Sequence, residues 1–500
     1  MSVKDGAMHL AKLDRDRSVY LDGELVKRVA KHPAFANSCK SAAALYDFQA
    51  RPENVEWMTF DTGTGRRANR AWQLPRSRED LVANRVAMTA WAEQHGGFMG
   101  RSPDHLACAI AGQIMGLEVF EQHGARFARA YRDYYDYARD NDVFLTYVII
   151  NPQADRSKAW GDQAKEDLTA RIVDEDGDGI TVRGAKMLGT SAIMAEEVFV
   201  ANLQPLQEGE DDLAVCFAMP LEDRGIKMLS RKSYEQNAVT PWDNPLSYRF
   251  DENDALIYFD DVKVPWERVF VFRDVNMCRA QFHDTPGHVY QNYQAQVRYT
   301  VKMKFLLAIA RRITETVGTI KMPAVREKLG QMASQIGVAE GLLYGMEAEG
   351  TQRGDYYVPN RRLLYAATAY TQGLYPKFIT EIRELAGGGL IMLPSSAADL
   401  AHPELANLFD TALVSAREGE DAYDRMKFLK LAWDAVGSEF ASRHTQYEMF
   451  YNGAQFVTRN HNFRTYDWDG AERILNAFLE GNDTVWAADG TRETAPDTTQ

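Results

Sequence analysis

The sequence has few of the features that metal clusters, membrane spans and nucleic-acid surfaces require. Its four cysteines, Cys39, Cys108, Cys216 and Cys278, lie far apart, and no Cys or His pair has metal-ligand spacing. No run of about 18 apolar residues is present, so we expect no membrane-spanning helix. The net charge of -14 argues against a nucleic-acid binder and gives no reason to expect affinity for an anionic membrane.

The same absences bear on cellular location. Isolated cysteines suit a reducing compartment. The first residues also lack the apolar core of a signal peptide, so we expect a cytoplasmic protein.

Nucleotide and calcium fingerprints are also missing. Gly387–Gly389 follows a helical pattern and lacks Gly-x-Gly-x-x-Gly spacing, which excludes a Rossmann fingerprint or P-loop there. This run is either a helix C-cap with a turn or a backbone that approaches another group closely. Asp174–Gly179 resembles the start of a calcium loop, but Ala185 stands where a bidentate acid is required, so we expect a hairpin turn.

What is present is an α–β–α order of patterns. After a short predicted hairpin around Asp22-Gly23, helical periodicity prevails to residue 142, and strand patterns separated by turns follow from 143 to 270. Long amphipathic segments follow at 290–317, 323–351, 363–385 and 421–451. We predict an α+β, mostly α chain, made of the following parts: an N-terminal α domain (1–142), a β-barrel or sandwich (143–270), a four-helix bundle (271–485) and a disordered tail (486–500).

A corner at Gly97–His105 is the first candidate site. Gly97 and Gly100 allow close backbone approach, while Ser102 and Pro103 predict a helix start. Arg101 then lies just outside a helix N-terminus and His105 on its first turn, which suits an anionic oxygen. The alternative is a surface helix cap with a solvated arginine.

Other segments leave two interpretations each. The loop Asn151–Arg156 follows a buried strand pattern and suits either a polar heterocycle or a strand-ending turn with a surface ion pair. The hydroxyls of Thr190 and Ser191 lie at a strand edge, where they either donate to a ring nitrogen or oxygen or belong to a satisfied turn. His288 opens the first bundle helix and is either catalytic or a satisfied core residue. The helix that ends at Gly453 is explained mostly by core packing and a glycine C-cap.

Five dispersed motifs, taken together, resemble one family, the oxygenase components of 4-hydroxyphenylacetate 3-hydroxylase. This family includes pyoverdine-chromophore (paerucumarin) hydroxylases and halophenol monooxygenases, and the resemblance runs from Val19 to about Gly453. The motifs are Phe98–Asp104; Asn151-Pro152 with Asp155-Arg156; Pro245-Leu246-Ser247 with Arg249–Glu252; Gly387–Leu390 with Leu393-Pro394-Ser395; and Gly437–Phe440.

The resemblance implies an acyl-CoA-dehydrogenase-like fold with a central β-barrel, usually assembled as a homotetramer. It implies a two-component system in which a separate flavin reductase supplies reduced FAD to this chain. With O2, a flavin C4a-hydroperoxide then hydroxylates a phenol at the ortho carbon to give a catechol. The phenolate is the better nucleophile, and a nearby cation lowers the phenol pKa from about 10 and stabilises the developing charge.

The resemblance also assigns roles. It makes Arg101 the phenolate anchor, within a substrate segment formed by Arg101, Ser102, Pro103, Asp104 and His105. The family often has Tyr where this chain has His105 and His where it has Tyr147. The exchange suggests His105 as base and Tyr147 as hydrogen-bond donor, and it puts 4-hydroxyphenylacetate itself in doubt as the substrate. His288 and Tyr293 are alternative bases. The implied flavin contacts are Tyr147, Val148, Ile149, Gln153, Ala154, Asp155, Arg156, Thr190, Tyr451, Asn452, Gly453 and Ala454.

Three alternatives compete with this assignment. An iron–sulfur dehydratase of the same fold would need clustered thiolates, which the sequence lacks. An acyl-CoA-dehydrogenase-type flavoenzyme would need a bundle carboxylate, for which Glu381, Glu384 and Glu439 are candidates. A non-catalytic flavin-binding or scaffold homologue is the third. The identity of the phenol, the choice of FAD over FMN and the identity of the reductase stay open.

Overall fold

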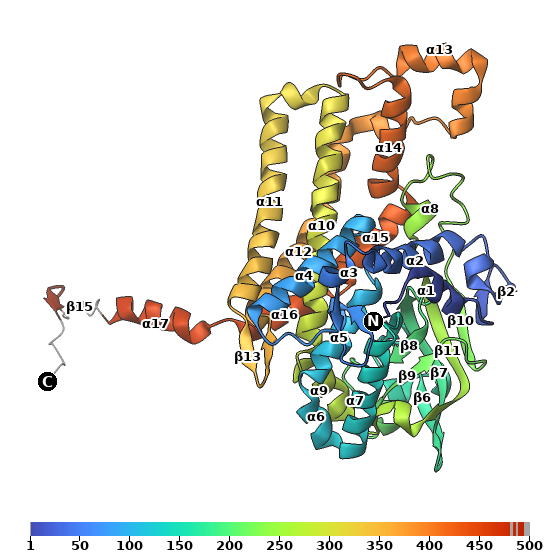
Figure 1. Ribbon diagram of the computed structural model, residues 1–500. Coiled ribbons are helices and arrows are strands. Elements are labelled where there is room, and N and C mark those ends of the chain that lie inside the picture. The colour runs from blue at the N-terminus through green and yellow to red at the C-terminus, as the bar shows by residue number, and fades with distance from the viewer. Residues whose placement is uncertain (1, 481–483, 487–488, 495–500) are drawn as a thin grey trace.

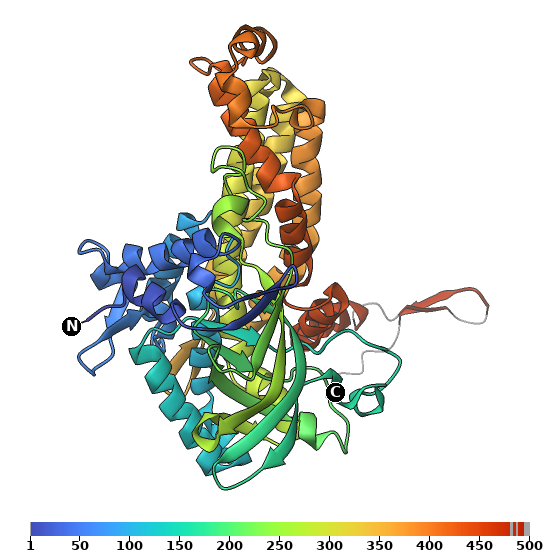
Figure 2. The same cartoon turned by 90° about the vertical axis from the view of Figure 1, so that its right-hand side faces the viewer.

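Two β-sheets occupy one end of the molecule, and a long helical bundle rises from them (Figure 1). The computed structural model describes residues 2–480, 484–486 and 489–494. The predicted α–β–α order is found along the chain. Viewed at 90°, the N-terminal helices flank the base of the bundle and the sheets lie beneath it (Figure 2). Within the described ranges, no helix has the length and apolarity needed to cross a membrane.

The strands form two separate sheets, so the closed barrel of our prediction is wrong and the sandwich alternative is the observed arrangement. Alternating apolar residues of both sheets pack on a shared core, which includes Val182, Val200 and Phe217. The edge strands of the larger sheet do not pair with those of the smaller one. The strands of the larger sheet follow the order β2 (Glu24–Val26), β1 (Ser18–Leu21), β10 (Ile226–Ser230), β11 (Asp254–Pro265), β7 (Gly179–Thr190) and β6 (Arg171–Glu175). The strands of the smaller sheet follow the order β12 (Val269–Phe272), β9 (Val215–Pro220), β8 (Glu197–Val200) and β5 (Leu145–Val148).

Two of the predicted turns are present. The hairpin β1–β2 turns at Asp22-Gly23, both with positive φ, and β1 pairs in parallel with β10. The predicted N-terminal domain therefore contributes two strands to the larger sheet. The acidic stretch Asp174–Gly179 joins β6 to β7 as a hairpin, as expected.

The N-terminal helices pack between the sheets and the bundle. Helix α5 matters most for function, since all twelve of its residues are buried. A buried helix of small and apolar residues lets neighbouring elements approach closely. These helices are α1 (Gly6–Leu13), α2 (Ala36–Ala50), α3 (Val55–Met58), α4 (Arg78–Gln94), α5 (Pro103–Ile114), α6 (Leu117–His123) and α7 (Ala125–Asp140).

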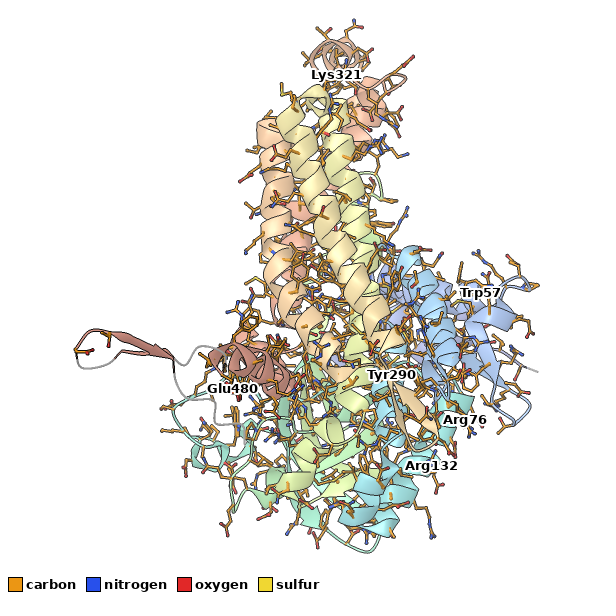
Figure 3. The ribbon with its side chains drawn as sticks, turned by 90° about the vertical axis from the view of Figure 1, so that its left-hand side faces the viewer. Trp57, Arg76, Arg132, Tyr290, Lys321 and Glu480 are labelled. Atoms are coloured by element: carbon orange, nitrogen blue, oxygen red, sulfur yellow. The ribbon has the colours of Figure 1, made fainter. Side chains whose placement is uncertain are left out.

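The bundle contains the predicted long helices, with one correction. The segment predicted as one helix at 421–451 is two helices, because Gly437 ends α14 and the Ser438 hydroxyl caps α15 by accepting the Ala441 N–H. Tyr290 lies near the base of the bundle, whereas Lys321 lies at its far tip (Figure 3). The helices are α9 (Val275–His283), α10 (Gly287–Thr316), α11 (Pro323–Ala348), α12 (Arg361–Ala386), α14 (Ala422–Val436) and α15 (Glu439–Phe450).

Smaller elements complete the fold. Gly387 directly follows α12 and continues into a 3-10 turn, where the space around the three glycines is open, as a C-cap and turn would have it. Helix α17 and the β15–β16 ribbon project from the body (Figure 1). The predicted tail, 486–500, falls partly outside the described residues, and its described part belongs to this ribbon. These elements are α8 (Ser247–Phe250), α13 (Pro403–Ala412), α16 (Gln455–Thr465), α17 (Trp468–Leu479), and the pairs β3–β4 (Thr59–Asp61, Arg67–Asn69), β13–β14 (Thr351–Arg353, Tyr356–Val358) and β15–β16 (Thr484–Trp486, Arg492–Thr494).

Candidate active site

The start of α5 is a buried corner, so the alternative of a solvated surface cap is wrong. Arg101 is only 8% exposed. Gly97 has φ +75°, and a Cβ there would lie 2.5 Å from the Lys302 Cβ on α10. A Cβ on Gly100 would meet the Tyr447 ring at the same distance. The two glycines therefore let the chain press against α10 and α15 immediately before Arg101.

The guanidinium of Arg101 is surrounded by neutral groups. Its Nη2 donates to the Tyr451 carbonyl at 3.0 Å, and its Nη1 contacts the His105 ring. The rings of Tyr147 and Tyr447 face it at 5.2 and 5.3 Å. No carboxylate of the described residues lies within ion-pair distance of it. Burial acts to lower the pKa of Arg101, but nearby Tyr147, Tyr447 and Glu252 hold it above its ordinary value.

His105 is held from α10. Its Nδ1 lies 3.0 Å from Gln294 Oε1, and its Nε2 lies 2.9 Å from Gln291 Nε2. The Tyr147 ring, on strand β5, packs 5.7 Å away between centroids. Burial and the charge of Arg101 hold the pKa of His105 well below its ordinary value, so the imidazole is neutral.

Asp104 and Ser102 face the protein interior. The Ser102 hydroxyl donates to Asp104 Oδ1 at 2.5 Å instead of capping the helix. Gln294 Nε2 donates to the same oxygen at 3.1 Å. Burial raises the pKa of Asp104 to about 6. Pro103 occupies the first helical position, as expected.

The two alternative bases lie in different places. His288 is on α10 one turn before Gln291, with Nδ1 3.2 Å from the Tyr365 hydroxyl and its ring 4.8 Å from that of His283. Tyr293 points to the other side of α10, where its hydroxyl donates to Glu347 at 2.5 Å. The structure therefore places Tyr293 away from Arg101, whereas His288 lies one turn from Gln291, which contacts His105.

The predicted flavin segments divide by exposure. Val148, the last residue of β5, is buried in the sandwich core, while Tyr147 on β5 and Ile149 just after it pack on the opposite side. In the following loop, Gln153, Asp155 and Arg156 are exposed and Ala154 is half-buried.

The remaining flavin segments lie nearer the corner. Thr190 donates to Asp254 Oδ1 at 2.6 Å. Tyr451 supplies the carbonyl that Arg101 binds, and Gly453 has φ +87° just before Ala454, the N-cap of α16. The C-terminal segment therefore reaches the corner across 350 residues of sequence.

Polar atoms without partners mark these same segments. Within the described chain, the buried Asn151 Nδ2, Ser191 Oγ and Asn452 Nδ2 have no hydrogen-bond partner. Asn452 belongs to a predicted flavin-contact segment, Ser191 directly follows Thr190, and Asn151 lies between the predicted contacts Ile149 and Gln153. Buried polar atoms left unpaired cost roughly 1–3 kcal/mol each, which favours a polar ligand that would satisfy them.

Several residues that sequence reasoning missed hold the corner together. Glu252 accepts the Arg101 N–H at 2.6 Å and binds Arg443 Nη1 at 2.8 Å. Arg443 also binds Asp254, which accepts a hydrogen bond from the Thr190 hydroxyl. A sequence signal existed on α10, where polar residues recur at helical spacing (Gln291, Gln294 and Arg298) on a helix expected to belong to the bundle. Glu252 stood within a quoted motif, but nothing local indicated its role.

A metal centre is not part of this arrangement. No group of three or more His, Cys, Asp or Glu side chains in the described ranges could hold a metal ion. All four cysteines are buried free thiols.

Comparisons with known proteins agree with this geometry. The N-terminal domain of 4-hydroxyphenylacetate 3-hydroxylase matches residues 5–271, and its C-terminal domain matches residues 278–480. The oxygenase component of 4-hydroxyphenylacetate 3-monooxygenase from Geobacillus sp. is 32% identical, over 97% of this chain and 98% of the relative. A pyoverdin chromophore biosynthetic protein from Pseudomonas aeruginosa is 34% identical, over 90% and 89%.

A solved structure shares the whole architecture. It is the oxygenase component of 4-hydroxyphenylacetate 3-monooxygenase complexed with FAD and 4-hydroxyphenylacetate. It superposes with a TM-score of 0.90 at 30% identity, and covers 96% of this chain and 99% of its own. Both family domains, in order and over nearly all of the sequence, confirm the resemblance drawn from the five motifs. The chain belongs to the 4-hydroxyphenylacetate 3-hydroxylase family.

Proposed function

We propose that this chain is the oxygenase component of a two-component, FAD-dependent monooxygenase that converts a phenol into a catechol by ortho-hydroxylation. The observation that carries the proposal is Arg101, a buried cation whose guanidinium has only neutral partners. A buried charge without a counter-charge is costly, and an incoming phenolate oxygen would supply that charge. Family membership supports the same reaction class.

The chain's own residues account for phenol activation. Arg101 favours the ionised phenol and so lowers its pKa. The neutral His105 beside it is an acceptor for the phenol proton, and the Tyr147 hydroxyl is a donor at the rim of the corner. Electron density at the ortho carbon rises when the oxygen becomes a phenolate, which prepares that carbon to attack an electrophilic oxygen atom.

The strand-end segments fit a flavin. The unpaired polar atoms of Asn151, Ser191 and Asn452 suit the nitrogen and oxygen atoms of an isoalloxazine ring, and Thr190 and Tyr451 directly precede two of these residues. When bound, reduced FAD supplies the electrophilic oxygen derived from O2. The loop Gln153–Arg156 and the β5 backbone at Tyr147–Ile149 are the further contacts that we propose.

The partners follow from this assignment. A separate flavin reductase delivers the reduced cofactor, and the substrate is a free or carrier-tethered phenol. A homotetramer is supported by exposed apolar residues on α16 and on the projecting α17, with Phe456 at 76%, Phe463 at 61% and Ile474 at 67%. A cytoplasmic location is supported by the four buried free thiols. Light scattering of the full chain tests the assembly.

The dehydrogenase alternative has less support. Its candidate carboxylates lie away from the corner: Glu439 pairs with Lys232 and Glu384 pairs with Lys328, both at the surface. Glu381 lines a shallow surface groove beside Pro376. None of the three contacts Arg101, His105 or a predicted flavin segment in the structure. We therefore favour the monooxygenase.

The test supplies reduced FAD and O2 to the purified chain with a panel of phenols. Catechol formation is followed by chromatography, and flavin reoxidation by absorbance. We expect Arg101→Met to bind reduced FAD normally but to form catechol at least about 10²-fold more slowly. The matched control is Arg311→Met, an exposed arginine on α10, which should match the unaltered chain. Tight oxidised FAD reduced by an acyl-CoA, or no catechol from any phenol, would contradict the proposal.

A further inference from the structure

We propose that Asp104 and Gln294 form a relay that fixes the tautomer of His105, leaving its Nε2 as the acceptor of the phenol proton. This inference rests on the proposed function, because it assigns the proton-accepting atom for that reaction. Asp104 and Gln294 are positioning residues: each acts on the substrate only through His105.

The first step of the argument concerns the amide of Gln294. Its Nε2 lies 3.1 Å from Asp104 Oδ1, and its Oε1 lies 3.0 Å from His105 Nδ1. A carboxylate oxygen can only accept, so the NH2 end of the amide must face Asp104. The carbonyl end then faces the imidazole. This orientation follows from donor and acceptor chemistry alone.

Asp104 is itself held in place. The Ser102 hydroxyl and the Gln294 amide both donate to its Oδ1. A proton on this carboxyl would therefore occupy the other oxygen, and Oδ1 would remain an acceptor. The orientation of Gln294 is thus the same whether Asp104 is ionised or neutral.

The second step concerns the two ring nitrogens of His105. Because Gln294 Oε1 can only accept, Nδ1 must carry the hydrogen. At Nε2 the neighbours are donors: the Gln291 amide at 2.9 Å and the Arg101 guanidinium. Arg101 Nη1 also lies 3.2 Å from Nδ1, but Gln294 Oε1 is the only one of these neighbours that must receive a hydrogen, so the hydrogen is on Nδ1. The lone pair is then on Nε2, where the phenol O–H replaces one of the two donors.

The third step is the proton transfer. The phenol O–H bond breaks, an Nε2–H bond forms, and the oxygen keeps the electron pair beside Arg101. The groups that face His105 are Arg101, just before α5, Tyr147 on β5, and Arg298 with the two glutamines on α10. Asp104 acts on it only through Gln294. Before substrate binds, the two arginines disfavour imidazolium. A phenolate next to Arg101 offsets that field, so the imidazolium and phenolate form together.

This relay answers a need that histidine creates at this position. A neutral imidazole has two tautomers, and only one of them places its lone pair toward Arg101. Without a fixed acceptor at Nδ1, part of the population would carry its hydrogen on Nε2 and fail to accept the phenol proton.

The experiment uses the full chain and a phenol whose phenolate absorbs visible light, 4-nitrophenol. We measure the apparent pKa of the bound phenol by absorbance, together with kcat, KM and their pH profiles. In Asp104→Asn, the new amide can donate to Gln294, turn it over and force the Nε2–H tautomer. We expect kcat to fall about 10²-fold or more, KM to change little, and the pKa of the bound phenol to rise.

Two further variants separate positioning from a merely structural role. Gln294→Met removes the acceptor and should resemble Asp104→Asn. Gln294→Glu restores an acceptor at Nδ1 and should recover most of the bound phenolate signal, which loss of folding would not allow. Thermal unfolding and reduced-FAD binding confirm that each variant is intact.

The outcomes are distinct. If the unaltered chain ionises and hydroxylates phenols, but Asp104→Asn and Gln294→Met keep its bound-phenol pKa and kcat, the relay is wrong. Equal losses in Gln294→Met and Gln294→Glu would also overturn it. If the unaltered chain forms no catechol from any phenol in the panel, the proposed function fails instead.

Discussion

Two buried arginines near the base of the bundle have opposite surroundings. Arg298, on α10, is 1% exposed and binds Glu448 with both terminal nitrogens, and Lys302 binds the same carboxylate at 2.9 Å. Arg101 lies just before α5, and its guanidinium is surrounded by a carbonyl, an imidazole and two aromatic faces. The first cation is neutralised within the protein, and the second is not.

The difference separates a structural charge from a functional one. A buried ion pair with both partners present holds two helices in register, here α10 and α15. A buried cation with only neutral partners retains an unused electrostatic field, which an anionic transition state can use. Burial, charge and residue type are alike for the two arginines, so only the presence of Glu448 distinguishes them.

The largest expected effect is on the paired arginine. Arg298→Met removes two charge-assisted hydrogen bonds to the buried Glu448, which keeps Lys302 as its partner, so we expect the free energy of unfolding to fall by about 3 kcal/mol. Arg101→Met removes an unpaired charge and one hydrogen bond to a carbonyl, so it should cost about 1 kcal/mol while removing catalysis. Urea unfolding of both variants measures the contrast. Equal destabilisation would show that the two sites are not different in kind.

The second prediction concerns pH and Asp104. Its pKa is raised by burial to about 6, above the ordinary 3.8, so the folded state holds this proton more tightly than the unfolded state. This group's contribution to stability is therefore lost as pH rises from about 4 to about 6, by about 3 kcal/mol.

Asp104→Asn lacks this titration, so its stability relative to the unaltered chain should rise by about that amount between pH 4 and pH 7. Urea midpoints at the two pH values test it. The control is Asp133→Asn, at an exposed position. Its free energy of unfolding should differ from that of the unaltered chain by the same amount at both pH values. If the difference between Asp104→Asn and the unaltered chain is also the same at both pH values, the Asp104 carboxyl is not desolvated in solution.

The third prediction compares the two glycines of the corner. Gly97→Ala places a Cβ against the Lys302 Cβ and the Arg298 carbonyl in the left-handed region, so we expect a loss of about 1–3 kcal/mol. Gly100→Ala meets only the end of the Tyr447 side chain, which can turn away. It should cost less stability but more activity, because Tyr447 packs on Arg101. Denaturation and catechol assays on both variants separate these effects.

The smallest expected effect is at Tyr293. Tyr293→Phe removes a hydroxyl that binds Glu347, which keeps its ion pair with Arg85, so we expect about 1–2 kcal/mol of destabilisation. Because this hydroxyl points away from Arg101, kcat should stay within about twofold of the unaltered chain. A loss of hydroxylation without unfolding would restore Tyr293 as a candidate base.

Much of the fold was predictable because its signals are local. The glycines before Arg101, Pro103 at the helix start and the Asp22-Gly23 turn are set by short-range sterics. Helical and strand periods record which faces are buried, so the α–β–α order emerged from the pattern. Whether the sheets close into a barrel could not be predicted in this way. A strand's pattern records which of its faces is buried, but it does not show which strand edges pair with each other.

The site itself was predictable only in part. Sequence singled out Arg101, His105 and Tyr147, and the structure brings all three together. It gave no role to Glu252, Gln291 or Gln294, whose importance depends on what lies opposite them across more than 150 residues of chain.

The sequence by itself determined that a cation and an imidazole share one helix start, and the five motifs identified the family. Only the tertiary structure decided that Arg101 faces no carboxylate whereas Arg298 faces Glu448. It also decided which nitrogen of His105 carries the hydrogen. The physical reason is that local propensity places a side chain on an element, whereas its charge partner, its burial and its protonation depend on elements far away in the sequence.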